Sequence, residues 1–250
     1  MSKVSFITKN FHRYDPASIN SYLEIGGFDA LKKAVTMDGE DIAALLAEAK
    51  IKGRGGAAYG MGRKWSQARA VKGEHKVIIC NADEGEPCTF KDRELIRNDP
   101  FNLIEAMAIG AWSIQAQDGY IYLREEYAHL RALLKNAIAE AERCGFLGKN
   151  ILGKKGFDFH IHLYSGAGAY VCGEGTALIR SIEGKAGRPR MKPPFIKQSG
   201  LFALPTCVNN VESLSIVPHL LLDEKKEYIG YGSGESLGTK LVSVGGNVKN

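Results

Sequence analysis

Glycine-rich segments with charged neighbours hold the residues of this sequence best suited to chemistry. The longest runs from Ser165 to Ile182 and reads SGAGAYVCGEGTALIRSI. It follows an alternating, strand-like segment and continues into a helical apolar pattern. Such a turn can hold a phosphate, because backbone N–H groups and the dipole of a helix N-terminus attract anions. The spacing is not G-x-G-x-x-G, since Val171 occupies the third glycine position, and no Walker motif follows. A tight structural turn therefore stays open as an alternative.

Two further segments place charge beside glycines or a strand end. Lys52–Trp65 contains five glycines and four cationic side chains. Glycines there permit unusual backbone angles or close approach of a ligand, and Tyr59 and Trp65 argue against a flexible linker. Asn81–Pro87 holds three carboxylates directly after a buried strand predicted at Lys76–Cys80. Ligands of open α/β sheets bind at such strand ends, although a solvated acidic turn is the alternative.

Two polar pairs complete the candidates. Asn209 and Asn210 precede a helix predicted from Val211 to Leu222, where their amides can donate to a ligand or one of them can serve as N-cap. His160 and His162 share one face of a predicted strand. No further ligand is near them in the sequence, so we expect a polar strand face and no metal site.

Composition places the chain among soluble globular proteins. It has 250 residues, of which 44% are hydrophobic and 24% charged, and its net charge of +5 is too small for a typical nucleic-acid binder. Its five cysteines include no C-x-x-C pair, which argues against a zinc or iron–sulfur site and suits the reduced thiols of a cytoplasm. Neither an apolar leader nor a run of about 18 apolar residues occurs, so we expect any link to a membrane to go through partners.

The elements that must position these residues follow an alternating order. Strands are predicted at Lys76–Cys80, Gly119–Leu123 and Phe157–Tyr164, with helices from Pro100 and over Glu125–Arg143 between them. This order predicts an α/β, Rossmann-like fold with a mostly parallel sheet flanked by helices. We expect an N-terminal portion at 1–62 with the glycine-rich loop, the Rossmann-like domain at 63–226, and the start of a ubiquitin-like domain at 227–250. A strand is predicted from Thr239 to Val244.

The residue inventory suits a flavin together with a second nucleotide. A phosphate needs amides and a cation, a flavin needs donors and acceptors in a glycine-lined slot, and a nucleotide base needs aromatic faces. Acyl and phosphoryl transfer fit less well, because the sequence has neither a nucleophile elbow nor a Walker motif.

Seven motifs in a fixed order resemble one known family. They are GRGG from Gly53, KWS from Lys64, NADEGEP from Asn81, KDRE from Lys91, GAGAYVCGE from Gly166, KPPF from Lys192 and PTCVNNVE from Pro205. Together they resemble the FMN- and NADH-binding flavoprotein subunit of respiratory complex I, the NADH-quinone oxidoreductase. The family includes NAD(P)-linked diaphorase subunits of hydrogenases and formate dehydrogenases.

The resemblance implies positions for two ligands. Ser213 would keep the hydroxyl of a family threonine, and Glu86 would lie beside the nicotinamide as the catalytic residue. The FMN pocket would be formed by Gly53, Arg54, Gly55, Gly56, Lys64, Asn81, Asp83, Glu84, Tyr170, Gly173, Glu174, Asn209, Asn210 and Ser213. The NAD(P) site would be formed by Tyr59, Glu86, Gly175, Lys192 and Phe195.

The implied chemistry is hydride transfer between NAD(P)H and FMN N5, with electrons passed singly to iron–sulfur partner subunits, among them a thioredoxin-like 2Fe-2S subunit. The implied location is cytoplasmic, free or peripheral to a membrane complex. The family's helical iron–sulfur portion and most of its ubiquitin-like portion have no counterpart here, so we expect no cluster in this chain. Whether it is a fragment or a natural short form stays open.

Two departures from the family concern the dinucleotide. The family commonly has Cys-Gly-Glu-Glu, whereas Gly175 takes the place of the second glutamate, which would bind the adenosine ribose and repel a 2′-phosphate. Of the two aromatic positions that sandwich adenine, Tyr59 is kept and Gln67 replaces the other. We therefore expect weaker discrimination against NADPH. Arg180, Arg188 and Arg190 are candidates to meet its extra phosphate.

Two alternatives to this enzyme remain. The chain could bind FMN without reacting with nicotinamide nucleotides and serve as an electron-transfer adaptor. It could also be a structural α/β module without a ligand, which requires every glycine to be a turn residue.

Overall fold

The computed structural model describes residues 5–248. The helices are α1 (Ile19–Glu24), α2 (Asp29–Ala34), α3 (Gly39–Glu48), α4 (Met61–Ala70), α5 (Lys91–Asn98), α6 (Pro100–Ile114), α7 (Arg131–Arg143), α8 (Gly175–Ile182), α9 (Val211–Ser215), α10 (Val217–His219) and α11 (Lys225–Gly230). The strands are β1 (Val77–Ala82), β2 (Asp118–Leu123), β3 (His160–Ser165), β4 (Thr206–Asn210), β5 (Gly232–Ser233) and β6 (Ser236–Leu237). The ends of the outer domains predicted at 1–62 and 227–250, residues 1–4 and 249–250, lie outside the described residues.

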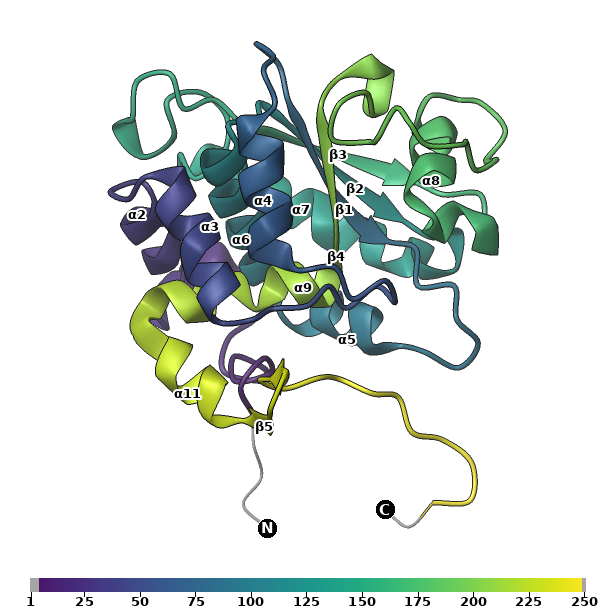
Figure 1. Ribbon diagram of the computed structural model, residues 1–250. Helices are drawn as coiled ribbons and strands as arrows, with labels where there is room; N and C mark the ends of the chain where they lie inside the picture. Colours follow the sequence, from purple (N-terminus) through teal and green to yellow (C-terminus); the bar gives the residue numbers. More distant parts are fainter. Residues whose placement is uncertain (1–4, 249–250) are drawn as a thin grey trace.

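The main sheet is parallel throughout and has the strand order β3-β2-β1-β4 (Figure 1). This confirms the predicted α/β class. The chain builds the sheet outward from β1 through β2 to β3 and then returns to place β4 on the other side of β1. That reversal is a topological switch point, and crevices at the carboxyl ends of such strands are the usual ligand sites of open α/β sheets.

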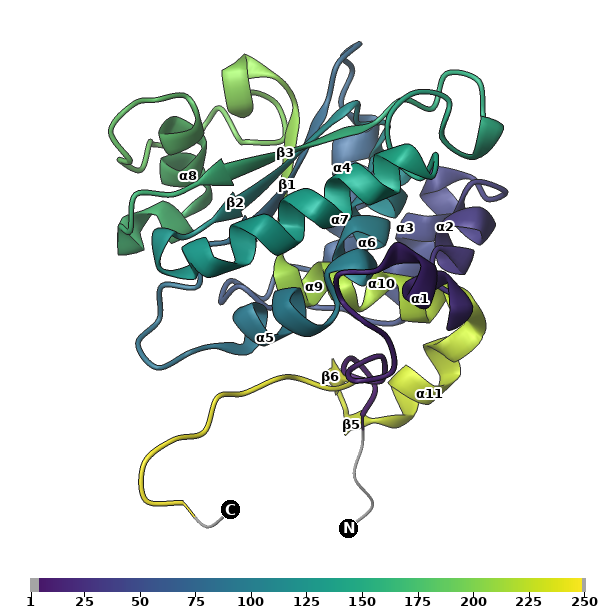
Figure 2. The same ribbon diagram turned by 180° about the vertical axis from the view of Figure 1, so that it is seen from behind.

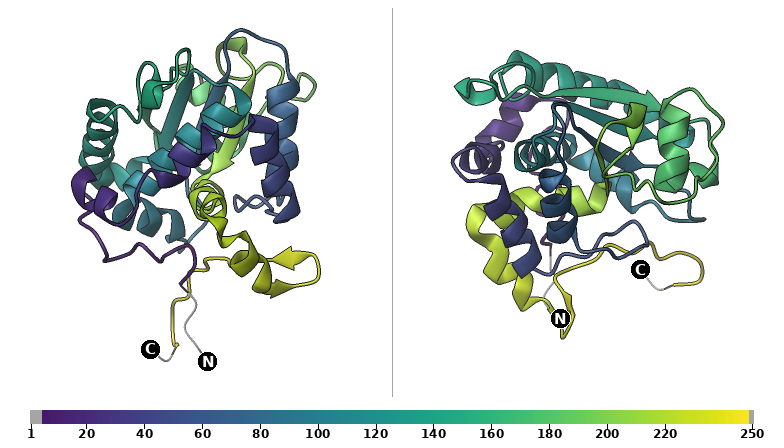
Figure 3. Two further views of the ribbon diagram at one scale, coloured as in Figure 1. Left: turned by 90° about the vertical axis from the view of Figure 1, so that its left-hand side faces the viewer. Right: turned by 45° about the horizontal axis from the view of Figure 1, so that its top comes forward.

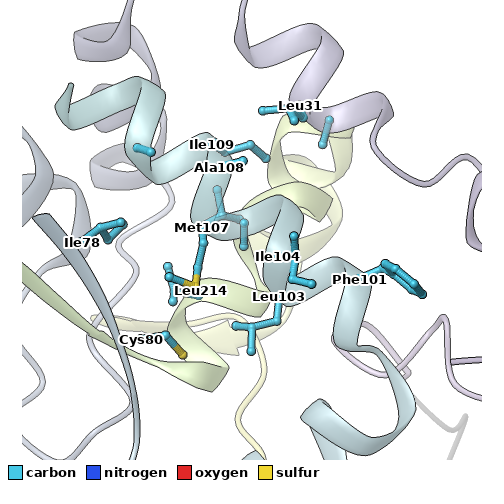
Figure 4. Packing of buried hydrophobic residues seen from close by; sticks show 14 of the residues in the cluster. Leu31, Ile78, Cys80, Phe101, Leu103, Ile104, Met107, Ala108, Ile109 and Leu214 are labelled. Atoms are coloured by element: carbon cyan, nitrogen blue, oxygen red, sulfur yellow. The ribbon is translucent and has the colours of Figure 1, made fainter. Parts of the chain in front are cut away.

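Helices cover both faces of this sheet, which explains why β1 is apolar along most of its length. Ile78 and Cys80 point into a large core with Met107 and Ile104 of α6 and Leu214 of α9 (Figure 4). The alternate residues Val77 and Ile79 pack on the opposite face against Leu178 and Ile179 of α8. Figure 2 shows α7 running along the sheet on the side away from α8.

The N-terminal helices share the large core. Leu31 of α2 and Leu46 of α3 are fully buried in the same hydrophobic cluster as Ile104. Asp38 caps α3 by accepting a hydrogen bond from the Glu40 N–H at 2.8 Å, which fixes the start of this helix. The glycine-rich loop therefore rests on helices that are packed into the main body.

The C-terminal third differs from the sequence prediction in two places. Residues 206–210 form β4, a strand that was not predicted, and the predicted helix after it is divided at Ile216 into α9 and α10, two residues before Pro218. The strand predicted from Thr239 to Val244 is wrong, because this segment pairs with no strand within the described chain. A short hairpin, β5–β6, precedes it and projects from the body in the left view of Figure 3.

Two buried carboxyl groups, those of Asp99 at the N-cap of α6 and Glu105 within α6, make the free energy of unfolding depend on pH. Burial raises the pKa of Asp99 to about 7, although hydrogen bonds from Tyr14 at 2.9 Å and Asn10 at 3.1 Å oppose the shift. Burial likewise raises the pKa of Glu105 to about 7, against the bond from Tyr22. Both groups hold their protons more tightly in the folded protein than in the unfolded chain, where the pKa is about 4. Their stabilising contribution is therefore full below about pH 4 and is lost as pH rises through about 7.

We expect Asp99→Asn to flatten the decline of the unfolding free energy between pH 4.5 and 7.5. The slope should fall by up to about 1.4 kcal/mol per pH unit, the limit for one proton. An asparagine can still accept from Tyr14, and Asn10 can rotate its amide to match. Urea unfolding across this range measures the effect, with exposed Glu24→Gln as control. A slope equal to that of the unchanged protein would contradict this origin of the pH dependence.

Candidate functional site

A cavity of about 730 Å³ opens where β1 and β4 end. Asn81 of β1 is paired with Asn210 of β4 in the parallel register, and both residues line the cavity. Helices α4 and α8 lie on opposite sides of β4 in the view of Figure 1, and both contribute to the walls. The cavity occupies the switch point of the sheet, and its volume falls within the roughly 300–1,000 Å³ of ordinary ligand pockets.

Most of the residues predicted for the two ligands line this cavity. Those from the FMN set are Gly53, Gly55, Lys64, Asn81, Gly173, Glu174, Asn209, Asn210 and Ser213. Those from the dinucleotide set are Tyr59, Gly175, Lys192 and Phe195. Predicted residues outside the lining are Arg54, Gly56, Asp83, Glu84, Glu86 and Tyr170.

The cavity has a positive lining. Among its described lining residues, Arg63, Lys64, Lys192 and Lys197 are cationic and Glu174 is acidic. This excess of cations favours a ligand that carries several negative charges.

The glycine-rich loop, with Gly53 and Gly55, forms one end of the cavity, which is called the inner end below. The Gly53 N–H donates to the Tyr59 carbonyl at 2.9 Å, and Gly56 has a φ of +96°, which disfavours other residues. A Cβ on Gly55 would lie 3.2 Å from the Cβ of Asn210, so the loop backbone lies against the start of α9. The Arg54 N–H donates to the Ser213 hydroxyl at 2.8 Å, which ties the loop to the same helix.

Lys64 and Asn209 are held on the cavity wall by neighbouring polar groups. The Lys64 ammonium donates to the Val208 carbonyl at 2.9 Å. The fully buried Trp65 donates its indole N–H to Asn209 Oδ1 at 3.2 Å. This bond fixes the amide orientation of Asn209, because an indole can only donate.

Asn210 is the N-cap of α9, the structural alternative considered for this pair. Its Oδ1 accepts from the Glu212 N–H at 3.0 Å, and its Nδ2 donates to Asp92 at 2.6 Å. Asp92 also accepts from Lys91 at 2.6 Å. A buried polar network thus fixes the base of the cavity.

The carboxylates that follow β1 have different surroundings. Glu84 is buried and accepts from the Asp92 N–H at 3.0 Å and the Tyr127 hydroxyl at 2.8 Å, so its side chain caps the start of α5. Asp83 Oδ2 is buried without a hydrogen-bond partner in the described part of the chain. Burial raises the pKa of Asp83 to about 6. A Cβ on Gly173 would lie 3.9 Å from this oxygen, which places an unsatisfied polar atom beside the cavity wall.

Glu86 and Tyr170, two further predicted residues, contact each other at the surface. The Tyr170 hydroxyl donates to Glu86 Oε1 at 2.6 Å, and this bond raises the pKa of Tyr170. Tyr170 is 65% exposed. The pair joins the loop after β1 to the glycine-rich segment before α8.

The helix start in that segment is occupied by its own carboxylate. Glu174 accepts from the N–H groups of Thr176 at 2.8 Å and Ala177 at 3.1 Å. Lys192 donates to the other oxygen of Glu174 at 3.2 Å. The α8 amides proposed for a phosphate are therefore satisfied internally, which favours the structural-turn interpretation of this helix start.

The opposite end of the cavity, called the outer end below, contains residues that the sequence did not single out as ligands. They are Arg63, Ile196 and Lys197, and the Lys197 ammonium donates to Gln67 Oε1 at 3.0 Å. The crowding of cations between Lys185 and Lys197 was the available signal. The arginines proposed there for an extra phosphate do not line the cavity: Arg180 and Arg190 donate to backbone carbonyls of Ala186 and Ser199. Arg188 is exposed and also lies outside the lining.

The histidine pair on β3 is engaged with carboxylates. His162 Nε2 lies 2.7 Å from Asp118 Oδ1, and His160 Nδ1 lies 3.9 Å from Glu142. Over residues 5–248, no group of three or more His, Cys, Asp or Glu is arranged to hold a metal ion. Across the same range no helix is both long and apolar enough to span a bilayer.

The fold and the cavity define a Rossmann-like α/β protein with a cation-lined cavity at the switch point of its sheet. Residues 46–219 match the family model of the Nuo51 FMN-binding domain. The chain belongs to this family.

Named relatives agree with that assignment. The chain is 49% identical to an NADH-quinone oxidoreductase subunit of Aquifex aeolicus over 93% of its own length and 54% of the relative. It is 44% identical to the NADP-reducing hydrogenase subunit HndC of Solidesulfovibrio fructosivorans, over 97% of this chain and 49% of that subunit. The structure resembles a chain of an NAD⁺-reducing [NiFe]-hydrogenase with a TM-score of 0.78 and 35% identity, covering 91% of this chain and 38% of that one. The chain spans about half the length of the curated relatives it matches.

Proposed function

We propose that this chain binds FMN and oxidises NAD(P)H, or catalyses the reverse reaction, and passes electrons singly to iron–sulfur partner subunits. The observation that carries the proposal is the cation-lined cavity at the switch point of an FMN-binding-domain fold. Names of the relatives support it, since they include NADH-quinone oxidoreductase and NADP-reducing hydrogenase subunits.

The residues present fit FMN. Gly53 and Gly55 leave backbone exposed at the inner end, Lys64 supplies a cation, and Asn81 and Asn209 supply amides. The unpartnered Asp83 oxygen beside Gly173 offers a further polar contact. When bound, FMN supplies the step between a two-electron hydride donor and one-electron acceptors.

The side chains of this chain would bind and orient the ligands. Lys64 and the Gly55 amide would hold anionic groups, and Asn209, fixed by Trp65, would orient the flavin edge. Glu86, which accepts a hydrogen bond from Tyr170, would be the catalytic residue beside the nicotinamide, and Phe195 and Lys192 would bind the dinucleotide. Holding two rings in contact replaces a collision in solution by a fixed geometry, which is the main contribution a protein makes to hydride transfer.

Several properties of the assembly are part of the same proposal. Electrons would leave through a thioredoxin-like 2Fe-2S subunit and other iron–sulfur partners, with no cluster in this chain. The site would operate in the cytoplasm, free or peripheral to a membrane complex. Residues 227–250 would begin a ubiquitin-like domain, separate from the N-terminal portion at 1–62 and the FMN domain at 63–226.

Anaerobic addition of NADH or NADPH to the FMN-loaded protein tests the activity. We expect one FMN per chain and loss of its yellow absorbance with either nucleotide or both. Protein that cannot be loaded with FMN would contradict the proposal. Flavin that photoreduces but ignores both nucleotides would favour the electron-transfer adaptor.

A further inference from the structure

Lys197 is a cation at the outer end of the cavity whose charge is not matched by a carboxylate. Its neighbour Lys192 is paired with Glu174 at 3.2 Å. For Lys197, the described residues include no carboxylate within ion-pair distance. Its side chain is half-buried and lines the cavity, with its ammonium 6.0 Å from the Phe195 ring centre.

The contacts around Lys197 leave N–H donors free for a ligand. Gln67 Oε1 accepts from the Lys197 ammonium at 3.0 Å and from the Tyr59 hydroxyl at 3.0 Å. An ammonium can only donate, so the amide orientation of Gln67 is fixed and its NH₂ group is left for a ligand. The Arg63 guanidinium lies over the Tyr59 ring, 5.7 Å from its centre. Such a set of donors with excess positive charge suits a phosphate monoester.

Gly175, where the family's second glutamate is missing, lines the same cavity and lies against the residue that precedes Lys197. A Cβ on Gly175 would lie 2.9 Å from Ile196 Cδ1, and Ile196 precedes Lys197 in the chain. Glu174, the acidic residue of the lining, is occupied by the α8 amides and Lys192. The described wall therefore holds no free carboxylate to repel a second phosphate near Lys197.

We propose that Lys197, with the Gln67 amide beside it, binds the 2′-phosphate of a phosphorylated nicotinamide dinucleotide and biases this cavity toward NADP(H). The inference rests on the proposed function, since it assigns a selecting residue within the same cavity. Lys197 is a specificity residue that touches the substrate far from the reacting ring.

Titration calorimetry with adenosine 2′,5′-bisphosphate and with 5′-AMP tests this without relying on turnover. We expect the bisphosphate to bind the FMN-loaded protein at least about tenfold more tightly than AMP, the value of one charged hydrogen bond. Lys197→Met should remove most of that difference, and Lys197→Arg should retain it. Lys185→Met, which removes an equal charge from an exposed position in the same basic segment, should leave it unchanged.

A second variant guards against misfolding of Lys197→Met. Gln67→Glu would place a carboxylate against Lys197 and should weaken bisphosphate binding at least about tenfold more than it weakens AMP binding. Equal weakening of both analogues, or no change in either variant, would overturn the assignment of Lys197. If the protein still bleaches with NADH or NADPH, the proposed function stands; if it bleaches with neither, the proposed function fails independently.

Discussion

Replacing Lys64 with alanine is expected to weaken FMN binding by about 10- to 100-fold. Lys64 is the cation that α4 places on the inner wall, fixed by its bond to the Val208 carbonyl at 2.9 Å. Losing a hydrogen bond to a charged group costs about 1.5–3 kcal/mol, which corresponds to that change in Kd. Val208 lines the cavity, so we expect water to replace Lys64 at its carbonyl and the fold to tolerate the change.

Quenching of FMN fluorescence on titration with the ligand-free protein measures this Kd. Lys64→Arg should recover part of the affinity, because it restores the charge with a different shape. Lys155→Ala, an exposed lysine outside the cavity, is the control. Wild-type affinity in Lys64→Ala would contradict the placement of FMN at the inner end of the cavity.

Replacing Gly175 with glutamate is expected to shift the ratio of kcat/KM for NADPH over NADH at least about tenfold toward NADH. A carboxylate on this wall would face the added phosphate of NADPH, and like-charge contacts in a binding site cost several kcal/mol. It would also accept hydrogen bonds from ribose hydroxyls of NADH. Gly175 therefore lacks the carboxylate that would disfavour binding of NADPH.

Gly175→Gln is the matched control for this prediction. Both variants meet Ile196 Cδ1, which lies 2.9 Å from an added Cβ but is the flexible end of a side chain. Their difference isolates the charge from the change in size. An unchanged NADPH/NADH ratio in Gly175→Glu, or an equal shift in Gly175→Gln, would refute the role of a missing carboxylate.

The sequence predicted the sheet because its strands and helices have strong local patterns. The apolar run at Lys76–Cys80 and the alternating helices predict parallel strands without any knowledge of the partners. β4 escaped prediction because TCVNN is short and polar at its end; its pairing with β1 stabilises it. The strand predicted at Thr239–Val244 does not form. Its sequence has a β-like pattern, but within residues 5–248 no neighbouring strand is available for it to pair with.

The sequence predicted which residues line the cavity better than it predicted where their side chains point. Glycines, Lys64 and Asn209 converge on one cavity as expected. Glu84, however, turns to cap α5, and Glu174 caps α8. A carboxylate next to a helix start can face a ligand or the helix amides, and sequence spacing is the same in both cases. Lys197 was visible only as one charge in a basic segment until the fold brought it to Gln67.

A stopped-flow experiment tests the central claim most directly. FMN-loaded protein is mixed under argon with NADPH or NADH, and the flavin absorbance is followed in time. We predict rapid bleaching, with NADPH reacting at a rate comparable to or greater than that of NADH. Flavin that stays oxidised with both nucleotides, yet is reduced by light, would contradict the claim that this cavity oxidises nicotinamide nucleotides.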